Sequence, residues 1–440
     1  MPCYPSTASR GSRERPMFAT SRRNVVFGAA AMMLASLSSI NCAWSADDVN
    51  LNLSLMIWDP AQKAGVQKAV DAFQATNPNV KVSLMQVPQD QYYTKLDASL
   101  GAGEGPDVMW QSSRASYYVD GGALEPLTGY IKADNLSLDG YNRQIVDLYK
   151  FGGEQYGLPK DMDAWTFVYN ADVFKKLGVE TPKADWTWED MVRIAKEIKA
   201  KQISSIIPLS YNFSFNNGVA SLVHALGGRV IDNNKGVMSS AAGTRALEMV
   251  KGLQDEGLIL KVADSSDFNP VSALISGKLA MAEIPSWNLS LLSKADLPSG
   301  TFQVVRMPSV NGSWTSDTNG LVYVMNANSK HKDEAWKLIK FLTSEAGAVL
   351  HAEGGAGLPA NTSKATLAAF VKANEKLAGL QEALSVTTEK SYLRTTTQYP
   401  KVIGANTKIS SAVMGPFYAG SVSASDTAKK IDETLNEALH

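Results

Sequence analysis

The stretch that decides the fold is EQYGLPKDMDAWTFVYN, residues Glu154–Asn170. Pro159 has a fixed φ and no N–H to give to a sheet, so a regular strand is expected to end there. The β-branched and aromatic run Trp165–Tyr169 predicts that a new strand begins shortly afterwards. A strand that ends, bends and resumes is typical of a chain that crosses between two domains. Asp161 and Asp163 would then face the space between those domains.

Length, charge and composition narrow the class of protein. The chain has 440 residues, which is enough for two domains of ordinary size. Its 42 basic and 43 acidic residues give a net charge of −1, without the basic excess that a nucleic-acid-binding protein normally carries. With 45% hydrophobic and 19% charged residues, the composition is typical of a soluble globular protein with a large core. We therefore expect two domains and no binding to nucleic acid.

The N-terminus has the pattern of an export signal. The pair Arg22–Arg23 precedes an apolar, Ala-rich run, Val25–Ile40. Ala43–Ser45 then offers small residues at the two positions that a signal peptidase reads, with cleavage after Ser45. We predict a signal peptide over residues 1–45 and a mature protein in the periplasm.

Several details of this leader leave alternatives open. Residues 1–16 are an N-terminal extension that adds little to the signal, so Met17 is an alternative start. Ser21–Val26 partly resembles a twin-arginine signal, although Val-Val stands in place of the usual Phe-Leu. Cys42 would suit a lipoprotein, but Asn41 before it is not the small residue that a lipobox requires. A membrane anchor would need about 20 apolar residues, more than this run supplies.

The positions of cysteine and histidine limit the chemistry. Both cysteines, Cys3 and Cys42, lie in the leader, so we expect no disulfide, thiolate metal site or Cys nucleophile in the mature chain. No GxSxG, Walker or Rossmann glycine pattern is present. We predict neither a metal nor a cofactor, because the four histidines share no metal-ligand spacing. They are His224, His331, His351 and His440.

Strand-like and helix-like segments alternate along the mature chain. Such alternation is typical of mostly parallel α/β sheets, whose ligands gather at the carboxyl ends of the strands. Thr187 and Asp190 have capping-box spacing and predict the start of one helix. The strands expected besides those of the opening stretch are Leu51–Ile57, Val80–Val87, Asp107–Trp110, Ile206–Leu209, Leu279–Ile284 and Gly320–Met325.

Short motifs are spread over nearly the whole mature chain, and together their order and spacing match those of one protein family. The chain resembles the periplasmic sugar-binding proteins of ABC importers, of the maltose-binding type, which are extracellular solute-binding proteins. The motifs are Gly105–Val108, Gly122–Leu127, Tyr156–Pro159, Tyr169–Asn170, Phe174–Gly178, Thr187–Met191, Gly277–Met281 with Trp287, Asp333–Lys337, Ile339–Leu342 and Gly357–Ala360.

The resemblance implies an architecture and a function. The fold would be α/β, a periplasmic-binding-protein fold of two domains that are joined by a hinge and close on a ligand in the cleft between them. The N-terminal lobe would comprise residues 46–160 and 316–356, and the C-terminal lobe residues 161–315 and 357–440. The protein would be a monomer that binds a sugar, or a related polyol, and delivers it to the permease subunits of an ABC transporter.

The resemblance also selects candidate ligand-binding residues. Sugar recognition needs flat apolar faces for the C–H side of a pyranose and planar polar groups for its hydroxyls. Loops after strands, the crossings between the domains and the C-terminal part would supply them. The residues expected to bind the ligand are Trp58, Asp59, Trp110, Gln111, Ser113, Arg114, Asp161, Asp163, Asn216, Asn217, Trp287, Asn319, Gly320 and Arg394.

The crossing acids and one tryptophan carry most of this expectation. Asp163 matches an acid that binds sugar hydroxyls in relatives, and Asp161 projects from the same face of an extended chain. Trp287 follows the Gly-Lys-Leu-Ala-Met segment at the spacing of the aromatic residue on which sugars stack. Ser113 stands where relatives often have an acid, and the family's C-terminal stacking tryptophan has no counterpart here. The sugar is therefore expected to differ from that of the maltose-binding relatives.

Each candidate has an ordinary structural alternative. The two crossing acids could form hinge ion pairs or cap a turn, and the pair Asn216–Asn217 could cap the helix that follows. Trp58, Trp110 and Trp287 could be core residues.

Two other functions would leave different patterns in the sequence. A carbohydrate-active enzyme would need two carboxylates that straddle a glycosidic bond, whereas Asp161 and Asp163 share one strand face, so we do not expect an enzyme. A binding protein for a non-sugar or anionic solute, or a chemoreceptor adaptor, would keep the same fold. An anionic ligand would want several cations in the cleft, and only Arg114 and Arg394 are placed there.

Overall fold

The computed structural model describes residues 48–57 and 60–440. The predicted leader with both cysteines, and the candidates Trp58 and Asp59, lie outside the described residues. Residues 47–440 form one unit.

The first sheet has five strands in the order β2-β1-β3-β15-β6. Its first three members are parallel, as the alternation of strands and helices predicts, while β15 runs antiparallel to both β3 and β6. The strands are β1 (Val49–Ile57), β2 (Val80–Pro88), β3 (Val108–Gln111), β15 (Val322–Met325) and β6 (Gly157–Pro159). We call the part of the chain built on this sheet the first lobe.

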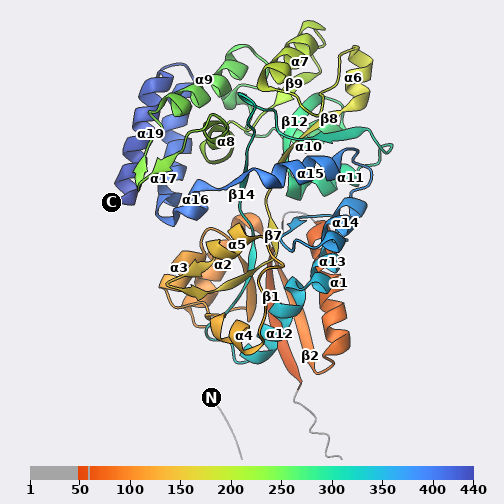
Figure 1. Ribbon diagram of the computed structural model, residues 1–440, viewed down its shortest axis with the longest axis vertical. Helices are drawn as coiled ribbons and strands as arrows, with labels where there is room; N and C mark the ends of the chain where they lie inside the picture. Colours follow the sequence, from red (N-terminus) through yellow and green to blue (C-terminus); the bar gives the residue numbers. More distant parts are fainter. Residues whose placement is uncertain (1–47, 58–59) are drawn as a thin grey trace, which may run out of the picture. The chain divides into compact units, whose positions relative to one another are not determined.

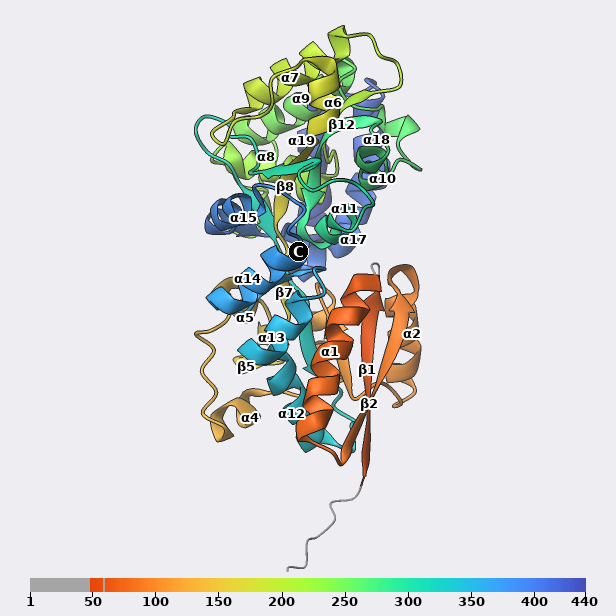
Figure 2. The ribbon, with the colours of Figure 1, turned by 90° about the vertical axis from the view of Figure 1, so that its right-hand side faces the viewer.

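Helices cover both faces of the first sheet. Figure 1 shows α2 and α3 on one side of the strands and α1 and α13 on the other. Helix α1 packs against α12 and α13, and α13 in turn packs against α14 (Figure 2). Val66, Val70 and Phe73 recur at the helical period along α1 and are buried in the core beneath it. These helices are α1 (Pro60–Thr76), α2 (Gln89–Gly101), α3 (Ala115–Asp120), α4 (Thr128–Ala133), α5 (Arg143–Leu148), α12 (Lys332–Thr343), α13 (Glu345–Ala352) and α14 (Lys364–Ala373).

The second sheet has four strands in the order β13-β8-β12-β9. Strand β8 lies antiparallel to both β12 and β13, and β9 lies parallel to β12. Every residue of β8 and β12 is buried, which explains their nearly continuous apolar sequences. The strands are β13 (Phe302–Val305), β8 (Trp165–Asn170), β12 (Leu279–Pro285) and β9 (Ile207–Ser210). We call the part built on this sheet the second lobe.

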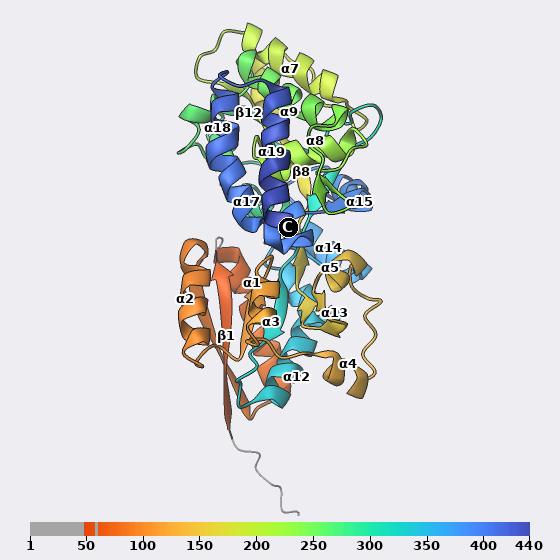
Figure 3. The same cartoon turned by 90° about the vertical axis from the view of Figure 1, so that its left-hand side faces the viewer.

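The second lobe carries most of the remaining helices. Helix α7 begins with the predicted capping box, in which Thr187 Oγ1 accepts from the N–H of Asp190. The C-terminal helix α19 packs beside α9, α17 and α18 (Figure 3). The helices are α6 (Ala171–Leu177), α7 (Trp188–Ala200), the π-helix η1 (Phe215–Val219), α8 (Ala220–Ala225), α9 (Ala241–Asp255), α10 (Pro270–Ile275), α11 (Leu289–Ser293), α15 (Leu380–Glu389), α17 (Ile403–Lys408), the π-helix η5 (Ile409–Val413), α18 (Met414–Tyr418) and α19 (Ala424–Leu439).

Short elements complete the described chain. Among the strands are β4 (Lys150–Phe151), β5 (Glu154–Gln155), β7 (Asp161–Met162), β10 (Ile231–Asp232), β11 (Lys235–Gly236), β14 (Ser316–Thr318), β16 (Leu358–Pro359) and β17 (Ser391–Leu393). The short helices are η2 (Val262–Asp264), η3 (Ser286–Asn288), α16 (Thr395–Gln398) and η4 (Pro400–Val402). None of the helices in this part of the chain is long and apolar enough to span a bilayer.

Three segments connect the two lobes: residues 160–164, residues 315–321 and the segment between α14 and α15. The opening stretch behaves as predicted: β6 ends at Pro159, a two-residue strand β7 follows, and β8 begins at Trp165. Strand β7 pairs with β16, and the N–H of Asp163 donates to the carbonyl of Asn319 at 2.7 Å, between β14 and β15. The first crossing is therefore bonded to the second crossing and to β16, which lies between α13 and α14 of the first lobe.

Helix α14 belongs by its contacts to the first lobe, because it packs on α13, whereas α15 contacts β8 and β13 of the second lobe. The exact lobe boundaries, 160/161, 315/316 and 356/357, stay a prediction.

Candidate functional site

A pocket with a cavity volume of about 390 Å³ lies where the crossings meet the strand ends of both lobes. It is open at the carboxyl ends of β1, β3 and β12, where a parallel or mixed α/β sheet places its ligand sites. The residues that line it are Met56, Gln89, Ser112, Asp161, Met162, Asp163, Asn269, Val271, Ser286, Trp287, Asn288, Leu291, Asn319, Leu321, Gly357 and Arg394.

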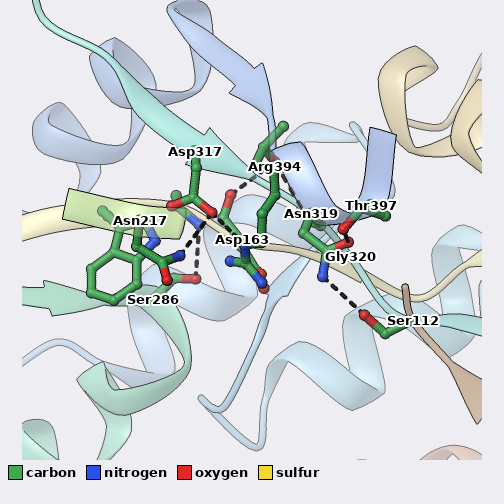
Figure 4. A network of polar contacts seen from close by, with 12 residues as sticks. Ser112, Asp163, Asn217, Ser286, Asp317, Asn319, Gly320, Arg394 and Thr397 are labelled. Atoms are coloured by element: carbon green, nitrogen blue, oxygen red, sulfur yellow. Dashed lines mark hydrogen bonds and ion pairs between the residues drawn. The ribbon is translucent and has the colours of Figure 1, made fainter. Parts of the chain in front are cut away.

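One wall of the pocket is an ionic cluster around Arg394. Its Nη2 donates to Asp163 Oδ2 at 2.8 Å, and its Nε donates to Asp317 Oδ2 at 2.5 Å (Figure 4). Asn217 Nδ2 donates to the same Asp317 oxygen at 3.1 Å. We call these four residues the pocket cluster. It joins the first crossing, strand β14, the π-helix η1 and the segment after β17.

A second set of contacts ties the cluster to the first lobe. Asn319 Nδ2 donates to Ser112 Oγ at 3.0 Å, and Thr397 Oγ1 donates to Asn319 Oδ1 at 3.1 Å (Figure 4). The backbone N–H of Arg394 donates to the carbonyl of Thr318 at 2.9 Å. The amide of Asn319 is therefore held from both sides, so its position does not depend on a ligand.

The other crossing acid, Asp161, has different surroundings. Its Oδ1 accepts the backbone N–H of Leu321 at 2.7 Å, and its Oδ2 bonds the ammonium of Lys160. That ammonium has no exposed surface, and it lies 3.9 Å from the ring centre of Trp110. We call Lys160, Asp161, Trp110 and Leu321 the hinge cluster, because it ties the first crossing to the second.

Burial changes the acidity of two carboxyl groups near the pocket. Loss of solvent raises the pKa of Asp163 to about 6, with Arg394 opposing the rise and Asp161 and Asp317 adding to it. Loss of solvent likewise raises the pKa of Glu283 to about 8, opposed by the backbone N–H of Asn212 and reinforced by Asp317. At neutral pH, Glu283 is therefore protonated and Asp163 is mostly ionised.

The aromatic part of the pocket is Trp287, at the end of β12. Its ring is half-buried and packs edge-on against Trp165, with centroids 5.4 Å apart and an interplanar angle of 79°. Val271 and Leu291 line the same lobe, and Met56 and Leu321 line the first. The pocket thus combines an indole held by its neighbour, apolar patches and a charged wall.

Five of the predicted residues line this pocket. They come from both crossings, from the end of β12 and from the segment after β17, so the structure brings together parts of the chain that lie far apart in sequence. They are Asp161, Asp163, Trp287, Asn319 and Arg394.

Trp110 and Gln111 do not line the pocket. Both side chains are fully buried, because β3 lies between β1 and β15 with helices on both faces of the sheet. The pocket receives the next residue, Ser112, as the strand ends. Trp110 instead packs against Tyr323 and beneath Lys160, which places it in the core of the first lobe.

Ser113 and Arg114 also lie outside the pocket lining. Arg114 Nη1 is 3.6 Å from Asp97 Oδ2, and its guanidinium lies over Tyr93, with 43% of its side chain exposed. It therefore belongs to the surface near α2 and α3. The pocket keeps Arg394 as the cation that lines it among the described residues.

Asn216, Asn217 and Gly320 support the pocket without lining it. The two asparagines do not cap a helix; they lie within the π-helix η1, where Asn216 Nδ2 donates to Thr396 Oγ1 at 3.2 Å. A side chain at Gly320 would place its Cβ 2.2 Å from the carbonyl oxygen of Asp161, so this glycine permits the close approach of two crossings.

Sequence reasoning missed Asp317, which lies behind the pocket wall, and most of the lining residues. Ser112 and Ser286 directly follow β3 and β12, two residues beyond the ends of the predicted strands, and the end of a strand is a usable signal. Asp317 carried no local signal, because its partner Arg394 is 77 residues away. The lining residues missed are Met56, Gln89, Met162, Asn269, Val271, Asn288, Leu291, Leu321 and Gly357.

The described residues contain no group of three His, Cys, Asp or Glu side chains placed to hold a metal ion. The arrangement is instead that of a binding site. Two α/β lobes joined by three crossings, with a pocket lined from both, define a solute-binding protein of the hinge type.

Comparison with known proteins gives the family. Residues 58–349 match the family described as bacterial extracellular solute-binding protein, and the chain belongs to this family.

Curated relatives and a solved structure show the same fold and class. A binding protein of Brucella abortus is 26% identical over 77% of this chain and 83% of its own length. The galactooligosaccharide-binding protein of Bacillus subtilis is 25% identical over 81% and 83%. The ABC substrate-binding protein Lmo0181 from Listeria monocytogenes, solved in complex with cycloalternan, has a TM-score of 0.77 and 23% identity, covering 89% of this chain and 99% of that one. These relatives are binding proteins.

Proposed function

We propose that this protein is the substrate-binding component of an ABC transporter, and that its pocket binds a mono- or oligosaccharide or a related polyol. The observation that carries the proposal is the pairing of an indole face with fixed hydrogen-bonding groups around one pocket. A pyranose needs this combination, because its C–H side is apolar while its edge carries hydroxyls. The names of the relatives support the same class of ligand.

Each group has a role in this proposal. The ring of Trp287 would stack on the C–H face of a sugar, held in place by Trp165. Asp163 would accept from hydroxyls, and Arg394 and Asn319 would donate to them. The volume of about 390 Å³ falls in the usual range for small-molecule sites, roughly 300–1,000 Å³.

Transport requires that binding changes the protein. The lining residues come from both lobes, so a ligand that contacts both would increase the population of the closed form. The permease subunits would then read the closed surface. We further propose that the mature chain is a periplasmic monomer, exported by a signal peptide over residues 1–45.

A role as a catalyst fits this pocket less well than a role as a binder. Its two lining carboxylates are already engaged, Asp161 by Lys160 and Leu321, and Asp163 by Arg394. Glycoside hydrolysis would require both to act on one bond from opposite sides.

A thermal-shift screen over monosaccharides, disaccharides, polyols and uronates tests the proposal. A ligand that binds only the folded state raises the melting temperature, and the stabilisation grows with the logarithm of one plus the ratio of ligand concentration to Kd. We expect at least one neutral carbohydrate to stabilise the protein. If only an anionic or nitrogenous solute does so, the protein is not a neutral-sugar-binding protein.

A variant pair then locates the site. We expect Trp287→Ala to abolish binding of the best neutral sugar in the screen without unfolding the protein. Trp314→Ala is the matched control, because this half-buried tryptophan also packs at the edge of the second-lobe core but lies outside the pocket. Equal calorimetric affinity in Trp287→Ala and the wild type would exclude the stacking role.

A further inference from the structure

The charges that line the pocket are few. Among the described residues they are Asp161, Asp163 and Arg394. The charge of Asp161 is balanced within the hinge cluster by Lys160. A ligand in the pocket therefore meets the electrostatic field of Arg394 and of the acids bound to it.

Arg394 is compensated by two carboxylates. Asp163 takes Nη2 at 2.8 Å and Asp317 takes Nε at 2.5 Å, so one positive charge faces two negative ones. With both acids ionised, the pocket cluster carries a net charge of −1. The charge of the arginine is therefore fully compensated. Its contacts with the two acids use two of its five N–H groups, so the arginine remains able to donate further hydrogen bonds.

Asp317 acts on the pocket from behind. The side chain of Asp317 has no exposed surface and does not line the cavity, whereas 16% of the Arg394 side chain is exposed. Asn217 holds the same Asp317 oxygen at 3.1 Å, and Figure 4 shows Asp317 and Asn217 on one side of the arginine. Because a buried charge is weakly screened, its effect on a bound ligand persists at physiological salt.

We propose that Asp317 sets the charge selectivity of the pocket: by compensating Arg394 from behind, it makes the site accept neutral sugars and reject those that carry a carboxylate or a phosphate. This inference rests on the proposed sugar-binding function and adds the class of sugar. A site for anions needs a cation whose charge the protein has left unpaired, and here a second acid removes that possibility.

Matched sugars test the selectivity in the wild-type protein. Isothermal titration calorimetry at pH 7 would compare galactose with galacturonate and glucose with glucuronate, because each pair keeps the pyranose ring and differs only in the carboxylate that replaces the hydroxymethyl group. We expect each acid to bind at least about tenfold more weakly than its neutral partner. Equal or tighter binding of an acid would overturn the inference while leaving sugar binding intact. Failure of every neutral sugar to bind would overturn the proposed function instead.

Asp317→Asn tests the residue itself. The substitution keeps an oxygen for Arg394 Nε and Asn217 Nδ2, and it changes the net charge of the pocket cluster from −1 to 0. We expect the ratio of acid to neutral affinity to rise by about tenfold. A purely structural role would weaken both members of a pair equally, so an unchanged ratio would contradict the proposal.

Two further variants complete the experiment. Asp432→Asn is the matched control, because this buried acid of α19 accepts from the N–H groups of Met238 and Ser239 and lies outside the pocket lining. It should lower stability and leave the ratio unchanged. Asn217→Asp adds a negative charge beside Asp317, so it should lower the ratio. If Asp317→Asn does not fold, Asn217→Asp tests the proposal in its place. An unchanged or increased ratio of acid to neutral affinity in Asn217→Asp would overturn the proposal.

Discussion

The first crossing carries two carboxylates two residues apart, and each belongs to a different cluster. In the hinge cluster, Asp161 bonds a buried ammonium and a backbone N–H of the next crossing, with 6% of its side chain exposed. In the pocket cluster, Asp163 bonds an arginine at the pocket wall, with 16% of its side chain exposed.

The difference in surroundings predicts a structural role for Asp161 and a ligand-binding role for Asp163. The hydrogen-bonding capacity of Asp161 is largely used by the protein, so its loss should affect folding more than ligand affinity. Asp163 lies against Arg394, which keeps unused donors at the pocket surface. The two aspartates of the first crossing therefore differ in role, because each bonds a different partner that lies more than 150 residues away in the sequence.

The largest effect that distinguishes the clusters is expected from Asp161→Asn. The variant leaves the ammonium of Lys160 buried without a counter-charge, and removing one partner of a buried ion pair costs about 3–5 kcal/mol. Urea unfolding followed by circular dichroism measures this loss. Glu353→Gln is the control, because its pair with Lys68 is exposed and worth about 0–1 kcal/mol. A loss below about 1 kcal/mol for Asp161→Asn would erase the distinction.

Asp163→Asn should show the opposite balance. Burial already disfavours the charge of Asp163, so we expect its free energy of unfolding to change by less than about 1 kcal/mol. Sugar affinity should fall by about 10- to 100-fold, since a charged hydrogen bond to ligand is lost. Calorimetry with the best neutral sugar from the thermal-shift screen measures it. Large destabilisation with unchanged affinity would place Asp163 with Asp161.

The pH dependence of stability tests the raised pKa values of the buried carboxyl groups. Glu283 has an ordinary pKa of 4.5 and a folded pKa of about 8, so the folded state binds its proton more tightly. Its contribution to stability is complete below pH 4.5 and is lost as the pH rises through 8, at no more than about 1.4 kcal/mol per pH unit. Asp163, raised to about 6, has the same sign.

Glu283→Gln isolates this contribution. The amide oxygen can still accept from the N–H of Asn212, so the variant removes the titration and keeps the hydrogen bond. Burial lowers the pKa of His224 to about 4, and this group has the opposite sign, gaining stability as the pH rises from 4 to 6.5. His224 titrates in both proteins, so its contribution cancels when the two are compared. The free energy of unfolding of the wild type minus that of Glu283→Gln should fall steadily between pH 5 and 8. A flat difference would show that Glu283 titrates normally.

The smallest expected effect is that of Thr397→Val. The substitution keeps the shape and removes the hydroxyl that holds Asn319 Oδ1 at 3.1 Å, which is worth about 0.5–1.5 kcal/mol. We expect sugar affinity to fall by a few-fold, because Asn319 is then fixed only by Ser112. Thr343→Val is the matched control for stability, because this buried threonine of α12 lies outside the pocket lining and its hydroxyl donates to the carbonyl of Ile339 at 2.9 Å. A loss of affinity greater than tenfold would mean that Thr397 itself binds the ligand.

Local chemistry in the sequence predicted the scaffold well. Pro159 ended a strand where expected, Thr187 and Asp190 began a helix, and the strands of the parallel part followed their apolar runs. These features depend on residues a few positions apart. The family resemblance then placed the three lobe boundaries, which stay a prediction.

Long-range contacts set the limits of that prediction. Trp110 is buried because β15, more than 200 residues later, pairs with β3, and nothing near Trp110 announces this. Asn216 and Asn217 were expected to bind the ligand, with helix capping as the alternative, but they lie within the π-helix η1, where Gly218 comes too close to the carbonyl of Asn212 to carry a side chain. Strands β14 and β17 were not predicted, and they are the elements that bring Asp317 to Arg394.

The three crossings also have a mechanical consequence. A single extended segment could swivel about its own axis, so two lobes on one tether would close in many orientations. Here the first crossing is bonded to the second through Asp161 and Leu321, and its strand β7 pairs with β16, which precedes the third crossing. Parallel tethers joined in this way resist twisting and leave bending as the soft motion. Every closure would then bring the same two faces together, which gives a membrane partner one surface to recognise whichever sugar is inside.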